Sequence, residues 1–285
     1  MSEVETGPNA EQATYWSETS GPKWVAMQQR IDAQIAPLGL AAIERAAPRP
    51  GERCLDVGCG CGQSSIQLAE RVQPGGQVLG LDLSVPMLAR AAERAKEAGA
   101  AATFERGDAQ IHPLEPSSVD LVFSRFGIMF FADPVAAFAN LRRALRPTGR
   151  LVFLCWQELG RNAWVTVPLG AAAQHLTLQP PEDPFAPGPF ALADADRTRS
   201  ILEGAGFTGV EIDPLEREIE VGGGAGLEEV IDFVLQIGPT GRALAEADPA
   251  TVQKVRASVR DALEPHYRDG ALRLGAATWI VSAQP

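Results

Sequence analysis

Three glycines alternate with other residues directly after a short apolar segment, in the run Leu55-Asp56-Val57-Gly58-Cys59-Gly60-Cys61-Gly62. Glycine adopts positive φ angles readily, and it lets backbone amides approach a ligand with no Cβ atom between them. In open α/β sheets, ligands bind at the carboxyl edge of the strands, where such turns lie. The pattern therefore predicts a nucleotide-like ligand across the end of this first strand.

The spacing of the turn argues against two diphosphate sites. The dinucleotide fingerprint G-x-G-x-x-G needs a glycine at position 63, where this chain has Gln63. The P-loop needs a Gly-Lys-Ser/Thr sequence, and no lysine lies near the turn. A nicotinamide-dependent oxidoreductase stays open as an alternative only if Gln63 can replace that glycine.

Short apolar runs alternate with segments of helical period from Gly51 to Trp156, a pattern typical of βαβ units and a parallel sheet. Helical patterns follow the glycine turn and occupy 84–99, 133–145 and 194–206. The predicted strands are 54–57, 78–81, 103–106, 119–124 and 151–156, a strand that begins with 207–212, and a last strand at 272–283.

Both flanks of this pattern differ from it. Residues 1–20 are polar and aperiodic, which predicts a loop or mobile tail, and a helical period then runs from Pro22 to an expected end near Pro37. We predict an N-terminal helical cap at 1–50 and a main domain at 51–285. Many prolines at about 157–192 and helical patterns within about 222–268 predict two lid insertions in that domain.

Charge and hydropathy exclude some partners. Lys and Arg number 25 against 36 Asp and Glu, and the net charge of −11 repels phosphate backbones, so nucleic acid is not expected as a substrate. No apolar run reaches the roughly 18 residues of a membrane span. The acidic N-terminus has no pattern of a secretory signal, and a cytoplasmic protein is expected.

The four cysteines favour reduced thiols over a metal site. Cys59 and Cys61 are too close together for a zinc knuckle or a redox dithiol, and no second pair follows them. We therefore predict no metal. Arsenite methylation through Cys59, Cys61 and Cys155 stays open as a rival.

Two further motifs, together with the glycine turn, resemble the motifs of a known enzyme family. Asp82 stands 20 residues beyond Gly62 at the expected end of the second strand, where a carboxylate can accept hydrogen bonds from ribose hydroxyls. The run Gly107-Asp108-Ala109 follows the third strand. Together these motifs resemble those of class I S-adenosylmethionine-dependent methyltransferases. Segments 124–134 and 145–151 resemble the ubiquinone/menaquinone C-methylase-like branch, and similarity is most specific within 53–156.

The resemblance implies a Rossmann-like fold with a seven-stranded, mostly parallel sheet, helices on both faces, an N-terminal helical cap and lid insertions. It implies S-adenosylmethionine as the cofactor. The glycines would lie under its methionine and ribose portions, Asp56 would reach its ammonium group, and Asp108 would hold the adenine amino group. The implied cofactor residues are Asp56, Gly58, Gly60, Gly62, Asp82, Leu83, Met87, Asp108, Ala109, Ser124 and Arg125.

Methyl transfer needs little covalent help, because the sulfonium is already an activated electrophile and the enzyme mainly aligns the acceptor. Phe126 and Trp156 are predicted walls of an apolar acceptor pocket. His175 is the preferred general base, ahead of His112, His266, Glu158 and Tyr15.

We predict methyl transfer to carbon, oxygen or nitrogen of an apolar small molecule, either a natural product or a quinone-like compound. A cofactor-binding scaffold without turnover remains an alternative. Pairing through the N-terminal helix would give a homodimer.

Overall fold

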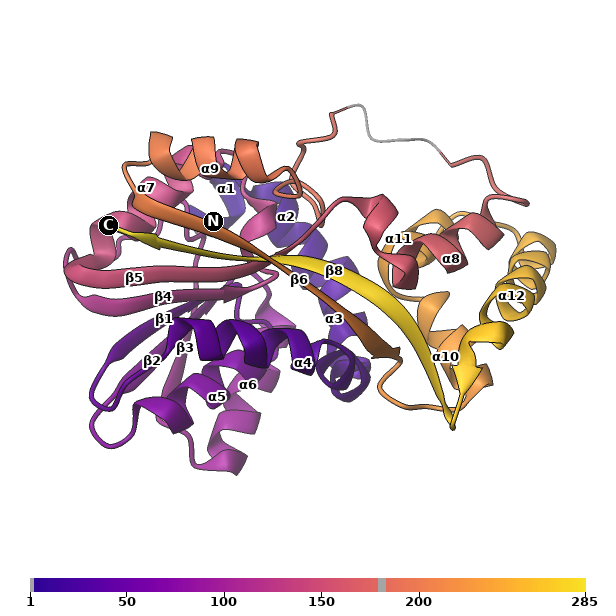
Figure 1. Ribbon diagram of the computed structural model, residues 1–285, viewed down its shortest axis with the longest axis horizontal. Helices are drawn as coiled ribbons and strands as arrows, with labels where there is room; N and C mark the ends of the chain where they lie inside the picture. The colour runs from indigo at the N-terminus through magenta and orange to yellow at the C-terminus, as the bar shows by residue number, and fades with distance from the viewer. Residues whose placement is uncertain (1–2, 179–182) are drawn as a thin grey trace.

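A mixed sheet forms the centre of the protein in the computed structural model, which describes residues 3–178 and 183–285 (Figure 1). Its strand order is β3-β2-β1-β4-β5-β8-β6, with β7 paired to β8. The four pairings among β1 to β5 are parallel, and the three pairings made by β8 are antiparallel. The strands are β1 (Arg53–Val57), β2 (Gln77–Asp82), β3 (Ala102–Arg106), β4 (Val119–Arg125), β5 (Leu145–Trp156), β6 (Thr208–Val221), β7 (Tyr267–Arg268) and β8 (Ala271–Gln284).

Helices cover both faces of this sheet, as predicted. Neighbouring helices α4 (Gln28–Ala46), α5 (Gln63–Val72) and α6 (Val85–Ala98) line one face, and α7 (Pro134–Ala144) packs with α9 (Ala195–Gly204) on the other (Figure 1). The central strands are consequently apolar on both sides, as parallel strands between helices must be. Phe123, Phe138 and Phe153 are fully buried between the layers.

The sheet departs from the sequence prediction at two places. The described residues contain an eighth strand, β7, because residues 267–268 turn back on the start of β8. Strand β5 begins at Leu145 rather than at 151, because Leu145 pairs with Val119 ahead of a register shift in β4. The predicted class, a mostly parallel Rossmann-like sheet, is confirmed.

Residues 1–2 lie outside the described part, and residues 7–9 form a turn. Residues 3–6 and 10–19 are helical, so the prediction of a loop or tail is wrong for them. They form α1 (Glu3–Thr6), α2 (Ala10–Thr14) and a π-helix (Tyr15–Thr19), and α3 (Ser20–Ala26) follows. Trp16 in this segment packs edge-on against Trp24 and Phe130, and a local period does not report a contact with a residue as distant as Phe130. This N-terminal segment lies along the carboxyl edge of the parallel strands, where its side chains meet the loops after β2 and β3.

Helix α4 continues through Pro37, so the expected helix end there is wrong. Proline inside a helix removes one backbone hydrogen bond and costs roughly 3 kcal/mol. The turns after it bury Leu38, Ala42 and Ile43 completely against the sheet. Because most helical stability in proteins comes from such packing, burial offsets the cost of the proline.

Both regions predicted as lid insertions contain helices, and these pack into one lobe (Figure 1). Helix α8 (Ala163–Ala172) belongs to the first region, and α10 (Leu227–Val234), α11 (Gly238–Ala243) and α12 (Pro249–Leu263) belong to the second. The long strands β6 and β8 carry this lid lobe beyond the edge of the parallel strands. Residues 179–182, within the first region, lie outside the described residues. Among the described residues no helix is long and apolar enough to cross a membrane.

Candidate active site

The glycine loop between β1 and α5 has the backbone conformation that its sequence predicts. Gly58, Gly60 and Gly62 all have positive φ, at 65°, 55° and 82°. At Gly58 the loop also touches the loop after β4, since a Cβ atom there would lie 2.5 Å from the Cα of Gly127. Only glycine fits such a backbone-to-backbone contact. The amides of Gly58 and Cys59 donate to the carbonyl of Leu81, that of Gly60 donates to Asp82, and that of Gly62 donates to the carbonyl of Cys59.

Asp56 lies beneath this loop and is completely buried. Its Oδ2 accepts hydrogen bonds from the hydroxyls of Ser64 (2.7 Å) and Ser65 (2.6 Å) at the start of α5. Its Oδ1 has no partner among the described residues. Burial raises the pKa of Asp56 from 3.8 to about 6, against the lowering effect of the two serine hydrogen bonds. The site therefore contains a buried carboxylate oxygen that lacks a donor.

Asp82 ends β2 and braces the same loop. Its Oδ2 accepts the amide of Gly60 and its Oδ1 the amide of Ser84, both at 2.8 Å. Burial raises the pKa of this carboxyl, and the backbone hydrogen bonds oppose that rise. A carboxylate oxygen can accept a second hydrogen bond, so ribose hydroxyls would use the remaining lone pairs.

Asp108, after β3, faces a residue of the N-terminal segment that sequence analysis missed. The Asn9 side-chain amide lies 3.0 Å from both Asp108 carboxylate oxygens and 3.0 Å from Oε1 of Gln110. The side-chain oxygen of Asn9, Oδ1, accepts a hydrogen bond from the backbone amide of Ala132 at 2.7 Å. Asn9 is 3% exposed, and it therefore sits in front of the carboxylate expected to bind adenine.

The N-terminal segment also covers the loop after β2. Ser84 donates its hydroxyl to the backbone carbonyl of Trp16 (2.7 Å), and Ser17 donates to the carbonyl of Leu83 (3.3 Å). Met87 lies on the inner side of this loop, with its Cε atom 3.0 Å from where a Gly60 Cβ would be. Leu83 is partly buried in this loop, and Met87 is buried in the first turn of α6. The resemblance implies adenine contacts at both residues.

The remaining predicted cofactor residues lie after β3 and at the end of β4. Ala109 is buried beside Asp108, and its carbonyl accepts the side chain of Asn140 at 2.9 Å. The hydroxyl of Ser124 donates to the carbonyl of Val57 at 2.7 Å and so ties β4 to the end of β1. The Arg125 side chain turns toward α4, where it meets Asp32 at 3.1 Å. Sequence analysis missed Asp32, although its polarity in an apolar helical period was a signal.

The predicted acceptor walls lie against each other. The rings of Phe126 and Trp156 stack with centroids 4.1 Å apart and planes 10° apart, and Trp164 of α8 packs on Trp156 at 4.9 Å. Phe126 is 8% and Trp156 6% exposed. Phe126 directly follows β4 and has a φ of 62°. Their role as pocket walls stays a prediction.

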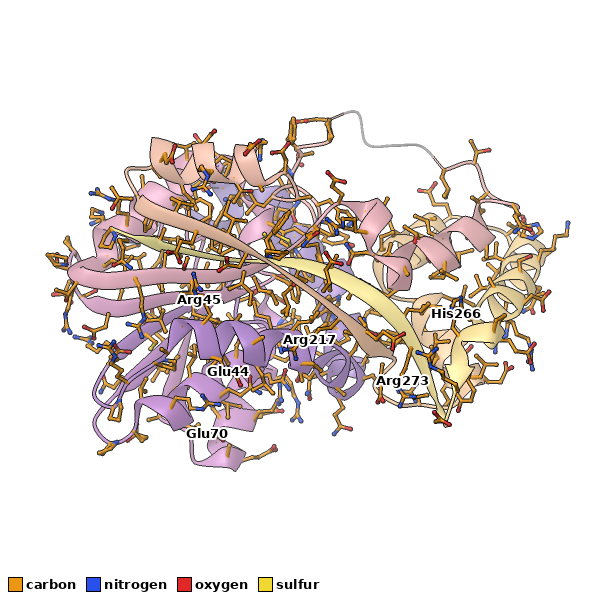
Figure 2. The ribbon with its side chains drawn as sticks, in the orientation of Figure 1. Glu44, Arg45, Glu70, Arg217, His266 and Arg273 are labelled. Atoms are coloured by element: carbon orange, nitrogen blue, oxygen red, sulfur yellow. The ribbon has the colours of Figure 1, made fainter. Side chains whose placement is uncertain are left out.

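The candidate bases are dispersed. His175 is exposed and its Nε2 lies 2.7 Å from the hydroxyl of Ser258 on α12, outside the residues gathered at the glycine loop. His266 lies in the lid lobe near the start of β7 (Figure 2). His112 pairs with Glu105 at 3.4 Å. A catalytic role for His175 stays a prediction.

The cysteines are buried thiols rather than anionic ligands. Burial raises the pKa of Cys61 to about 12 and that of Cys59 well above its ordinary value. Cys155, in β5, is fully buried and its thiol faces the carbonyl of Leu192 at 3.6 Å. Within residues 3–178 and 183–285, no three His, Cys, Asp or Glu side chains are grouped as metal ligands. Nothing in this geometry favours the arsenite alternative.

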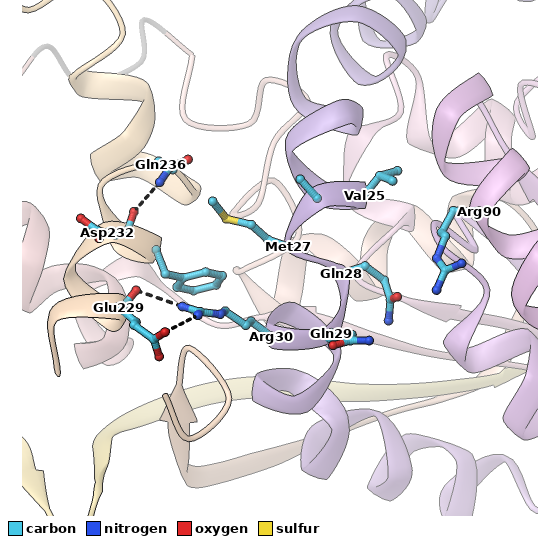
Figure 3. Close-up of a pocket in the computed structure, with 11 residues that line it drawn as sticks. Val25, Met27, Gln28, Gln29, Arg30, Arg90, Glu229, Asp232 and Gln236 are labelled. Carbon is cyan, nitrogen blue, oxygen red and sulfur yellow. Dashed lines mark hydrogen bonds and ion pairs between the residues drawn. The ribbon is translucent and has the colours of Figure 1, made fainter. Parts of the chain in front are cut away.

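A cavity of about 710 Å³ opens where the N-terminal cap, α6 and the lid lobe meet (Figure 3). Its lining combines Met27 and Phe233 with the amide side chains of Gln28, Gln29 and Gln236. Arg30 from α4 crosses it to Glu229 of α10 at 3.2 Å. A volume of this size accommodates a small organic ligand.

Comparison with known proteins agrees with this geometry. The family model described as a methyltransferase domain matches residues 54–149. This segment is a methyltransferase domain. It contains the glycine loop, Asp82 and Asp108, the residues that carry the resemblance to class I S-adenosylmethionine-dependent methyltransferases of the ubiquinone/menaquinone type. The predicted resemblance is therefore confirmed.

The curated relatives are similar over the same part of the chain. Nocamycin O-methyltransferase from Saccharothrix syringae is 38% identical over 116 residues, which are 40% of this chain and 41% of that protein. Demethylmenaquinone methyltransferase from Thermus thermophilus is 38% identical over 113 residues, 40% of this chain and 51% of that protein. The chain thus spans about half or less of the length of these relatives.

A solved structure extends the likeness beyond the matched segment. Phosphoethanolamine N-methyltransferase 2 from Haemonchus contortus, with S-adenosylhomocysteine bound, is 25% identical with a TM-score of 0.54. The match covers 87% of this chain and 52% of that chain. The shared part therefore includes most of the sheet and its helices.

Proposed function

We propose that this protein transfers the methyl group of S-adenosylmethionine to a small-molecule acceptor. The observation that carries the proposal is the glycine loop with the buried Asp56 beneath it. One oxygen of Asp56 lacks a donor among the described residues, and an ammonium group supplies one. The relatives named above are methyltransferases, which supports this assignment.

The residues at the carboxyl edge of the sheet match successive parts of the cofactor, from its amino-acid end to its adenine. Asp56 would bind the ammonium group, the amides of the glycine loop would lie under the methionine and ribose portions, and Asp82 would accept ribose hydroxyls. Asp108 and the amide of Ala109 would bind the adenine edge, after the Asn9 side chain gives up its place on Asp108. The cofactor supplies an activated methyl group on a sulfonium.

The protein's contribution to the reaction is positioning and exclusion of water. Holding two reactants in line is worth roughly 7–11 kcal/mol of the barrier in favourable cases. The strand end at Ser124 and Arg125 would flank the sulfur, and the stacked Phe126 and Trp156 would form an apolar surface beside it. The lid lobe would complete the acceptor site, since α3, α4 and α10 line an open cavity of about 710 Å³.

The acceptor that we propose is a natural product or a quinone-like compound. Two relatives support this class, because one is named for nocamycin and another for demethylmenaquinone. The lining of the cavity supplies a polar group to such an acceptor through the side-chain amide of Gln29. The side-chain amides of Gln28 and Gln236 already donate to Asp32 and to the backbone carbonyl of Asp232. An acceptor with both an apolar ring system and hydroxyl, carbonyl or amide groups fits best.

Isothermal titration with S-adenosylhomocysteine tests the cofactor assignment. We expect binding in the micromolar range by the wild-type protein, and a loss of about tenfold in the Asp108→Asn variant, because the adenine amino group then faces a weaker, neutral acceptor. The exposed Asp213→Asn variant is the matched control and keeps full affinity. No heat of binding by wild-type protein would contradict the proposal.

Turnover separates an enzyme from a scaffold. Formation of S-adenosylhomocysteine from S-adenosylmethionine would be followed with a panel of polyketide and naphthoquinol acceptors. We expect release that depends on one of these acceptors. Tight cofactor binding with no transfer to any of them would favour the alternative of a cofactor-binding scaffold.

A further inference from the structure

A buried ionic cluster joins α4 to the glycine loop, and of its residues only Arg125 was assigned above to the cofactor. At its centre is Asp32 of α4, which is 7% exposed. The Asp32 carboxylate accepts hydrogen bonds from Gln28 (2.5 Å) and Arg125 (3.1 Å), and it forms an ion pair with Arg94 (3.0 Å). We refer to Gln28, Asp32, Arg94 and Arg125 as the Asp32 cluster.

The two arginines of this cluster extend from Asp32 to the second half of the glycine loop. Arg94, from α6, donates to the backbone carbonyl of Cys61 at 2.6 Å. Arg125, at the end of β4, donates to the side-chain oxygen of Gln63, the first residue of α5. The Asp32 carboxylate of α4 therefore contacts arginines from α6 and β4, and Arg125 links it to Gln63 at the start of α5.

The two halves of the loop are held by different groups. Asp82 fixes the first half through the amide of Gly60. The second half has the Asp32 cluster above it, and Gly62 fits closely against α6, since a Cβ there would lie 2.9 Å from the Cβ of Ala91. Without its arginines, the carbonyl of Cys61 would lose the donor that fixes its direction.

Stability alone does not explain why charges stand here. Buried ion pairs are on average no more stabilising than apolar residues of similar volume. Helix α4 packs against the sheet with apolar side chains elsewhere, including the fully buried Leu38 and Ile43. A guanidinium, however, can bind a carboxylate and a second acceptor at once, which a hydrocarbon cannot do.

We propose that Asp32 is a positioning residue for the cofactor: through Arg94 and Arg125 it fixes residues 61–63 of the glycine loop in the conformation that binds the amino-acid end of S-adenosylmethionine. The proposal rests on the proposed function. It predicts that the cluster strengthens binding of the methionine portion of the ligand more than binding of its nucleoside portion.

The Arg94→Gln variant separates positioning from stability. It leaves Asp32 with one guanidinium, so the charges of the cluster balance and the fold is retained, but Cys61 loses its charged donor. Asp32→Asn removes the carboxylate while keeping its shape, and Asp32→Glu tests rescue by a longer carboxylate. Glu44→Gln, on the exposed side of the same helix (Figure 2), is the matched control for a lost negative charge.

Titration of each variant with two ligands is the test. S-adenosylhomocysteine contains the amino-acid end, and methylthioadenosine lacks it. We expect Arg94→Gln and Asp32→Asn to weaken S-adenosylhomocysteine binding about tenfold and methylthioadenosine binding less than threefold, with partial recovery in Asp32→Glu and no change in Glu44→Gln. Thermal unfolding without ligand would show which variants are folded.

The outcomes distinguish the two proposals. If wild-type protein binds neither ligand, the proposed function fails. If wild-type protein binds S-adenosylhomocysteine and folded Arg94→Gln binds it equally well, or if both ligands lose affinity by the same factor, Asp32 has only a structural role and this inference is overturned. If Asp32→Asn does not fold, Arg94→Gln alone decides.

Discussion

The contact between the Gly58 and Gly127 backbones offers a direct test of the loop geometry. In Gly58→Ala, the new methyl group meets the Cα of Gly127 at 2.5 Å and its carbonyl carbon at 3.1 Å. Both atoms belong to the backbone, so no side chain can rotate away. Residue 58 also has a φ of 65°, which a non-glycine residue adopts at a cost of roughly 1–2 kcal/mol.

The expected loss is the sum of these two effects. Forcing a methyl group into a packed site costs typically 1–3 kcal/mol, so Gly58→Ala is expected to lower the free energy of unfolding by about 2–5 kcal/mol. A displaced loop would also weaken S-adenosylhomocysteine binding by about tenfold or more, equivalent to roughly 1.4 kcal/mol. Urea denaturation measures the first quantity and isothermal titration the second.

Gly99 provides a matched control for backbone strain. Its φ is 60°, close to that of Gly58, but a Cβ there meets no atom within 4 Å among the described residues. Gly99→Ala therefore carries the strain without the collision, and we expect a loss of about 1 kcal/mol with unchanged ligand affinity. Equal losses of stability in the two variants would refute the argument from close approach.

Three further outcomes are expected. The pKa of Asp56 is raised to about 6 in the folded protein, so its ionisation opposes folding increasingly from pH 3.8 to about 6 and by a constant amount above. Asp56→Asn should remove this dependence in urea denaturation. If anionic Asp56 binds the ammonium group, titrations of wild-type protein should show weaker S-adenosylhomocysteine binding as the pH is lowered through about 6. An affinity that stays constant from pH 5 to 7.5 argues against that role. Asn9→Ala frees the Asp108 carboxylate and should strengthen S-adenosylhomocysteine binding severalfold by titration, whereas weaker binding would mean that Asn9 holds Asp108 in place for adenine. His175→Ala should leave stability and cofactor affinity unchanged because the ring is exposed, and only a loss of acceptor-dependent turnover would support its catalytic role.

The local chemistry of the site was predictable from sequence because it depends on short stretches of chain. A strand, a glycine turn and a helix start are adjacent in sequence, so the local sequence from Asp56 to Gly62 predicts the backbone geometry of this loop. Asp82 and Asp108 each end or follow a strand, and parallel strands bring their carboxyl ends to one edge. The sheet class and the position of Asp82 therefore followed from periodicity and spacing, whereas the binding roles of Asp56 and Asp108 were implied by the family resemblance.

Tertiary structure alone decided what covers and braces that edge. Asn9 meets Asp108 across 99 positions of sequence, and Arg125 meets Asp32 across 93. A periodic pattern does not predict such pairs, because the two polar side chains of each pair are far apart in sequence and come together only when the chain folds. The same reason explains Pro37: its helix persists because the sheet buries the residues that follow it, a contribution that local sequence rules do not include.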